Sequence, residues 1–177
     1  MSLGDGEKAA LRALAHPVRL QIMSLLTGAE LTAAEVAREL GLTHANASYH
    51  LRNLLAGGLI VTAGEEKIRG GLAKRYRYDT HREPVGGPPS DEQRRADYAA
   101  IAHELIRRSA KARFAESGNA LGDGDFWIEP ETWMAIRDRI SDALDDLHRA
   151  AKPPRTPGTV RTSTTIAMFR HRQEEPS

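Results

Sequence analysis

The stretch from residue 31 to residue 60 constrains the fold most, because it encodes two short helices joined by a tight turn. Thr32 precedes Glu35 by three residues, which is the spacing of a helix capping box. Apolar residues then recur at helical spacing until Gly41, which can adopt the left-handed conformation that ends a helix. Thr43 is placed to cap a second helix. The sequence therefore predicts two helices separated by a turn of about three residues.

Two helices joined in this way have the helix-turn-helix arrangement, whose second helix can enter the major groove of DNA. The polar face of the second helix carries hydrogen-bonding side chains and no acid. The candidates for DNA contact are Thr43, His44, Asn46, Ser48, Tyr49 and Arg52. Asparagine can pair with adenine through two hydrogen bonds, and serine or histidine can bind base edges or phosphates. A helical hairpin with a solvated polar face explains these residues equally well on their own.

A basic β-hairpin is expected directly after the second helix. Two β-favouring runs, at residues 59–62 and 74–78, enclose three glycines. Between residues 67 and 77 there are five basic residues and no acidic one: Lys67, Arg69, Lys74, Arg75 and Arg77. Strand alternation places Tyr76 and Tyr78 on one face and the two arginines on the other, so the hairpin can present guanidinium groups to a phosphate backbone. The alternative is a charged edge strand that protects the sheet.

The order of these segments is similar to that of a known family. The resemblance begins with residues 11–26, LRALAHPVRLQIMSLL, and continues through residues 32–37, 48–54 and 56–60. Over residues 8–80 the chain resembles winged helix-turn-helix transcription regulators of the arsenic-repressor-like (ArsR) superfamily. The resemblance implies a dimeric, sequence-specific DNA binder, usually a repressor, whose affinity for its operator is changed by an effector. It also implies that His50 packs inside the domain or contacts a phosphate.

The chain beyond this domain is expected to mediate dimerisation. We place the winged helix-turn-helix domain at residues 7–80, a Pro- and Gly-rich linker at 81–90, an accessory region at 91–170 and a disordered tail at 171–177. A long helix from Asp91 to about Glu116 is predicted. Its apolar seam consists of Tyr98, Ile101, Ala102, Leu105, Ser109 and Ala112. We expect this seam to pack against the same helix of a second subunit, the alternative being that it folds back within its own chain.

A small α+β unit is expected at the C-terminal end. Residues 126–128 and 159–169 are strand candidates, and a further helix begins at Pro130 between them. The predicted fold class is thus mostly α with a small β component (α+β), in which this unit follows the winged domain and the dimerisation helix. Phe126, Trp127 and Trp133 are expected either to form the core of the unit or to line an effector pocket.

Composition excludes several other classes of protein. The chain has 177 residues, no cysteine and a formal net charge of +1, so neither disulfides nor thiolate metal sites are possible and bulk charge does not indicate nucleic acid. No catalytic motif is present, so an enzyme is not expected. Asp97 and His103 lie six residues apart on one helix, a poor chelating geometry, so we expect no metal and no cofactor. Without a membrane-length apolar run or a signal-peptide core, a cytoplasmic protein is expected.

The sequence thus favours a homodimeric transcription regulator that binds double-stranded DNA at a palindromic operator, as a repressor controlled by a small-molecule or protein effector. The alternative is a winged-helix module that binds another protein and has no specific DNA site.

Overall fold

We describe the protein from a computed structural model, which describes residues 17–68, 70–79, 88–115 and 118–171. Its elements in chain order are α2 (Pro17–Thr27), β1 (Leu31–Thr32), α3 (Ala33–Leu40), α4 (His44–Ala56), β2 (Val61–Ile68), β3 (Gly71–Arg77), α5 (Asp91–Ser109) and α6 (Pro130–Ala150). Residues 1–16, most of the predicted linker and residues 172–177 lie outside the described residues.

The two central helices begin and end where the sequence predicts. The Thr32 N–H donates to Oε2 of Glu35 at 2.8 Å, and the Glu35 N–H donates to Oγ1 of Thr32 at 3.3 Å, which completes the capping box of α3. Gly41 ends α3 with a φ of +66°, in the left-handed region that favours glycine. Thr43 caps α4 by accepting a hydrogen bond from the Asn46 N–H at 3.2 Å. The helix-turn-helix is therefore specified by local contacts.

The described strands form an antiparallel three-stranded sheet in the order β1-β3-β2. Strands β2 and β3 form the predicted hairpin, which we call the wing. Its register pairs Ile68 with Gly71, and Gly70 at the turn has a φ of +97°. The sequence did not indicate β1, which pairs Leu31 with Tyr76 and so attaches the base of the wing to the start of α3.

The hydrophobic core lies entirely in the winged helix-turn-helix domain. Its buried residues come from α2, β1, α3, α4, β3 and the residue before β2: Ile22, Met23, Leu26, Leu31, Val36, Ala37, Ala47, Leu51, Leu54, Ile60 and Tyr76. Each large side chain removed from water in this way contributes roughly 1.5–3 kcal/mol. His50 is also buried, which agrees with the expectation that it packs inside the domain. The predicted winged-helix, α+β fold class is confirmed.

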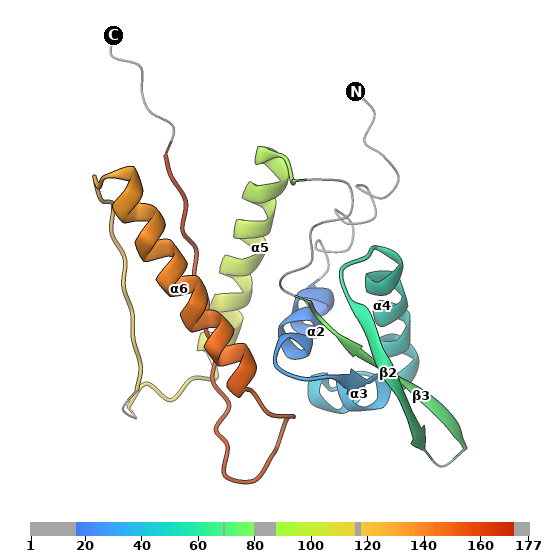
Figure 1. Ribbon diagram of the computed structural model, residues 1–177. Helices are drawn as coiled ribbons and strands as arrows, with labels where there is room; N and C mark the ends of the chain where they lie inside the picture. The colour runs from blue at the N-terminus through green and yellow to red at the C-terminus, as the bar shows by residue number, and fades with distance from the viewer. Residues whose placement is uncertain (1–16, 69, 80–87, 116–117, 172–177) are drawn as a thin grey trace.

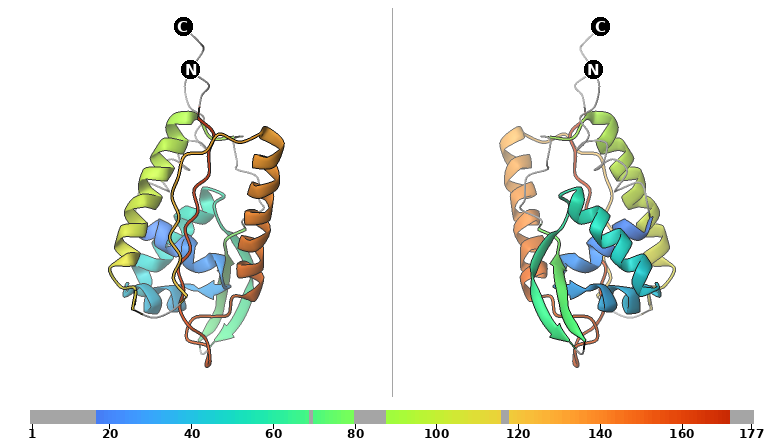
Figure 2. Two further views of the ribbon diagram at one scale, coloured as in Figure 1. Left: turned by 90° about the vertical axis from the view of Figure 1, so that its left-hand side faces the viewer. Right: turned by 90° about the vertical axis from the view of Figure 1, so that its right-hand side faces the viewer.

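Helices α5 and α6 lie on the side of α2 opposite the wing (Figures 1 and 2). Of the residues described after position 80, only Glu104 is buried, and no apolar side chain there is. The C-terminal half therefore builds no apolar core of its own in a single chain. No helix within the described ranges is both long and apolar enough to cross a membrane.

The prediction of a small C-terminal α+β unit was wrong about its two strands. Neither residues 126–128 nor residues 159–169 form a strand in the structure, although the second segment runs extended beside α6 (Figure 1). The alternating pattern correctly indicated an extended backbone, but a strand also needs a partner edge. The first segment is three residues long and is followed almost at once by Pro130, which cannot donate to a ladder.

The predicted length of α5 was also too great. The helix ends at Ser109 rather than near Glu116, so Ala112 lies beyond it. The Ser109 hydroxyl donates to the Ile106 carbonyl at 2.9 Å, and the N–H groups of Lys111 and Ala112 bond carbonyls three residues back, which tightens the last turn and ends the helix.

Candidate nucleic-acid interface

Helix α4 divides into a core face and a solvent face. Ala47, Leu51 and Leu54 are buried, and their spacing fixes which side of the helix faces outward. The candidate contact residues lie mainly on the other side: Thr43, His44, Asn46, Tyr49 and Arg52 are exposed, and Ser48 is half-buried. The solvent face therefore offers hydroxyl, amide, imidazole and guanidinium groups together, without a carboxylate.

The wing lies on the same side of the molecule as α4. Figure 2 (right) looks onto this side, with the strands beside the helix and with α5 and α6 away from both. Lys67 and Lys74 are exposed, and within the described part of the chain neither forms an ion pair. Arg69, the remaining candidate near the turn, lies outside the described residues. Two cations of the wing, Lys67 and Lys74, are thus available to a partner.

The Arg75 side chain makes contacts within the domain that strand alternation did not predict. Its guanidinium pairs with the Glu66 carboxylate, donates to the Glu30 carbonyl and lies 3.8 Å from Oε2 of Glu35, and its side chain is 25% exposed. These contacts join β3 to β2, to the residue before β1 and to the first turn of α3. Arg75 therefore holds the base of the wing, and sequence reasoning missed its partners because two of them lie 40 or more residues away along the chain.

Arg77 occupies the far end of β3, at the base of the wing. Its Nη2 lies 3.7 Å from Oδ2 of Asp79, and the side chain is about half exposed. The four predicted wing residues that the structure describes are therefore not equivalent. Lys67 and Lys74 extend along the hairpin, whereas Arg75 and Arg77 bind acids close to the body of the domain.

The charge of Glu35 is stabilised by this arrangement. Burial by itself would raise the pKa of the carboxyl group, but hydrogen bonds from the backbone and hydroxyl of Thr32, followed by the positive charges of Arg75 and Arg38, lower it below its ordinary value. The same carboxylate thus caps α3 and faces the arginine at the base of the wing, so it connects the helix-turn-helix to the wing.

The predicted dimerisation seam is only partly exposed. Ile101 lines a cavity against α2, and the ring of Tyr98 contacts Phe169 with centroids 5.4 Å apart. Ala102 and Ala112 are exposed, Ser109 is half-buried, and Leu105 is 47% exposed beside Ile106 at 69%. The seam therefore contacts its own chain on one side and leaves an apolar strip on the other.

The aromatic residues expected in the accessory region do not gather. Trp127 is 97% and Phe126 76% exposed, while Trp133 is half-buried on α6, and none of the three lines either of the cavities described below. Asp97 accepts a hydrogen bond from Gln93 at 2.7 Å within α5. No cluster of three or more potential metal ligands occurs among the described residues.

Comparison with known sequences supports the fold of the N-terminal half. The sequence model of a family described as "Helix-turn-helix domain" matches residues 14–63, which include α2, α3 and α4. The matched stretch is therefore similar to a helix-turn-helix domain, and α4 corresponds to the second helix of that arrangement. No curated protein matches the chain significantly.

Several solved structures are similar to the chain at low identity. An ArsR-like transcriptional regulator from Rhodococcus sp. RHA1 is 19% identical, covers 81% of this chain and 98% of its own, and has a TM-score of 0.36. A homodimeric winged helix-turn-helix DNA-binding domain from Mycobacterium bovis, of a possible ArsR-family regulator, is 20% identical over 66% and 89%, with a TM-score of 0.36. The transcriptional repressor BigR from Xylella fastidiosa is 22% identical over 60% and 89%, with a TM-score of 0.39. Because these TM-scores lie below 0.5, we draw no function from them.

Proposed function

We propose that this protein is a sequence-specific DNA-binding transcription regulator that acts as a homodimer, with α4 in the major groove and the wing along the sugar-phosphate backbone. The observation that carries the proposal is the solvent face of α4, which exposes Asn46 and Arg52 and lies beside the wing, where Lys67 and Lys74 are exposed. Asparagine and arginine are the side chains that read adenine and guanine through two hydrogen bonds, and lysines neutralise phosphates.

The proposed dimer is formed through α5. The chain buries no apolar residue after position 80 within the described ranges, and Leu105 and Ile106 remain exposed on this helix. Packing against a second copy would remove these two side chains from water and would bury few polar groups. A two-fold dimer presents two copies of α4, which favours an operator made of two inverted half-sites. Occupation of such an operator within a promoter is the route by which the protein would repress transcription, under the control of an effector.

Selection of DNA fragments from a random-sequence pool tests the proposal. The purified chain should enrich one inverted-repeat sequence and bind it at least about a thousandfold more tightly than a scrambled duplex at physiological salt. A protein-binding module whose hairpin is only a charged surface would enrich no sequence, and that result would contradict the proposal.

A substitution in α4 then tests base recognition directly. Asn46→Ala should reduce the preference for the selected duplex by roughly 1–3 kcal/mol while changing the affinity for scrambled DNA little. Asn119→Ala, at an exposed position outside α4, is the matched control and should change neither. An equal loss on both duplexes would mean that Asn46 does not read a base.

A further inference from the structure

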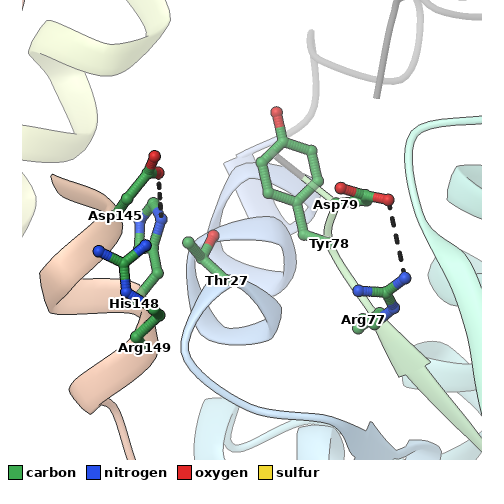
Figure 3. Close-up of a pocket in the computed structure, with 7 residues that line it drawn as sticks. All are labelled: Thr27, Arg77, Tyr78, Asp79, Asp145, His148 and Arg149. Atoms are coloured by element: carbon green, nitrogen blue, oxygen red, sulfur yellow. Dashed lines mark ion pairs between the residues drawn. The ribbon is translucent and has the colours of Figure 1, made fainter. Parts of the chain in front are cut away.

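Two cavities separate the winged helix-turn-helix domain from α5 and α6. The first has a volume of about 220 Å³ (Figure 3). The winged-helix side of this cavity consists of residues from α2 and from the end of β3, namely Thr27, Arg77, Tyr78 and Asp79. Helix α6 supplies Asp145, His148 and Arg149 on the opposite side. Its lining is almost entirely polar or charged, so this compartment suits a polar group.

The second cavity has a volume of about 180 Å³ and lies between α2 and α5. Leu20, Met23 and Ile101 give it an apolar wall. One end carries Glu104, which is 4% exposed and lies 3.3 Å from Nε of Arg108. Because this acid is already neutralised by arginine, the compartment favours an uncharged, apolar group.

The two cavities meet at Thr27 and Tyr78, which line both. The Tyr78 N–H donates to the Leu26 carbonyl at 3.2 Å, so its backbone is fixed to the end of α2. Burial, followed by the negative charges of Asp79 and Asp97, raises the pKa of the Tyr78 hydroxyl. The hydroxyl therefore remains protonated at neutral pH and can donate a hydrogen bond where the polar and apolar compartments join.

The polar compartment contains one buried imidazole nitrogen, Nδ1 of His148, that forms no hydrogen bond with the described residues. Three side chains there can carry positive charge, Arg77, His148 and Arg149, and each lies near one acid. The Nδ1 of His148 lies 3.8 Å from Oδ1 of Asp145, longer than a hydrogen bond, and the ion pair between Arg149 and Asp146 is exposed and therefore weak. A carboxylate at this position would give His148 a closer acceptor, and it could share the exposed guanidinium of Arg149 with Asp146.

We propose that the paired cavities form an effector site for a small organic acid, with its apolar body against Leu20, Met23 and Ile101 and its carboxylate between His148 and Arg149. The regulatory role of this site rests on the proposed function, whereas binding of the acid does not depend on it. The site adjoins the wing through Arg77, the last residue of β3, and an acid seated there would bridge α6 to that strand. Any effect of the acid on DNA affinity must be matched by an equal effect of DNA on affinity for the acid.

Benzoate, benzamide and benzylamine test the chemistry, because they share one apolar ring and carry an anionic, a neutral and a cationic head. Titration of the full chain, followed by NMR, should show benzoate binding below about 10 mM and at least about tenfold more tightly than the other two. Ring protons of bound benzoate should show contacts with the methyl groups of Leu20, Met23 and Ile101. Absence of benzoate binding in this range, equal binding of benzylamine, or contacts with other methyl groups would overturn the assignment.

Two exposed arginines of α6 provide a matched pair of variants. Arg149→Glu should weaken benzoate binding at least about tenfold, whereas Arg139→Glu, at an exposed position that lines neither cavity, should leave it unchanged. Equal losses would show a general charge effect and would overturn the assignment.

Repeating the benzoate titration in the presence of the selected DNA fragment tests the regulatory part separately. A dissociation constant for benzoate that changes at least about threefold on DNA binding supports an effector role, and an unchanged constant overturns it. If no DNA sequence is selected while benzoate binds as described, the proposed function fails and the binding site stands.

Discussion

At the scale of single residues, the neighbouring cations Lys74 and Arg75 of β3 differ in exposure and in contacts. Lys74 is exposed, whereas the Arg75 guanidinium donates to the Glu66 carboxylate and the Glu30 carbonyl and lies 3.8 Å from the Glu35 carboxylate. Strand alternation predicts which face of the sheet a residue occupies. It does not predict whether an acid that is distant in the sequence lies close enough to form an ion pair with it. The sequence could therefore predict a basic hairpin, and it could not separate the cations free to bind phosphate from those that hold the wing.

This difference predicts opposite effects for two substitutions. Lys74→Gln should weaken binding to every DNA sequence and reduce the slope of log affinity against log salt by about one unit, with little change in stability. Arg75→Gln should lower the free energy of unfolding by about 1–2 kcal/mol, because several charge-assisted hydrogen bonds are lost.

Urea unfolding and fluorescence anisotropy titrations at several salt concentrations measure both quantities. If Arg75→Gln flattened the salt slope and left the stability unchanged, its assignment to the base of the wing would be wrong.

At the scale of elements, the helices could be predicted and the C-terminal strands could not. The limits of α3 and α4 follow from Thr32, Glu35, Gly41 and Thr43, whose hydrogen bonds and backbone angles are local. Residues 159–169 have an equally clear alternating pattern, yet strand formation depends on an edge contributed by another part of the chain. The same reason explains why β1 went unpredicted, since its two residues pair with β3 more than 40 positions away.

The capping box predicts a specific pH dependence. The pKa of Glu35 is lower in the folded chain than its ordinary value of 4.5, so its carboxylate stabilises the fold above that pH, and the contribution is lost as the pH falls through the folded pKa. Glu35→Gln keeps the acceptor for the Thr32 N–H but removes the charge. The wild type should therefore be more stable than this variant at pH 7, and the difference should shrink as the pH falls below 4.5.

Urea unfolding of both proteins across this pH range gives the difference directly. A difference that stays constant with pH would show that the charge of Glu35 does not contribute.

At the scale of the whole molecule, one half has a core and the other half has an exposed apolar surface. The core lies between Ile22 and Tyr76, while Leu105 on α5 and Leu147 on α6 are exposed to a similar degree, 47% and 49%. Composition and helical spacing indicated an apolar strip on α5, and the structure shows that Ile101 on the same helix faces α2 instead. The cavities at this junction could not be predicted, because they depend on how α5 and α6 sit against α2 and β3.

The proposed α5 interface predicts different results for the two leucines. Leu105→Asp should convert the dimer to a monomer, because a carboxylate would be buried in the interface without a partner. Leu147→Asp, equally exposed on α6, should remain dimeric. Sedimentation velocity measures the result, and dissociation caused by Leu147→Asp but not by Leu105→Asp would move the interface to α6.

Hydroxyl-radical footprinting of the full chain on its selected DNA fragment tests the central claim most directly. A dimer that inserts two α4 helices should protect two regions on one face of the duplex, centred about 10 base pairs or a small multiple of that distance apart, with wing contacts flanking them. Protection that is uniform along the fragment, or equal on a scrambled fragment, would contradict recognition of an operator by α4.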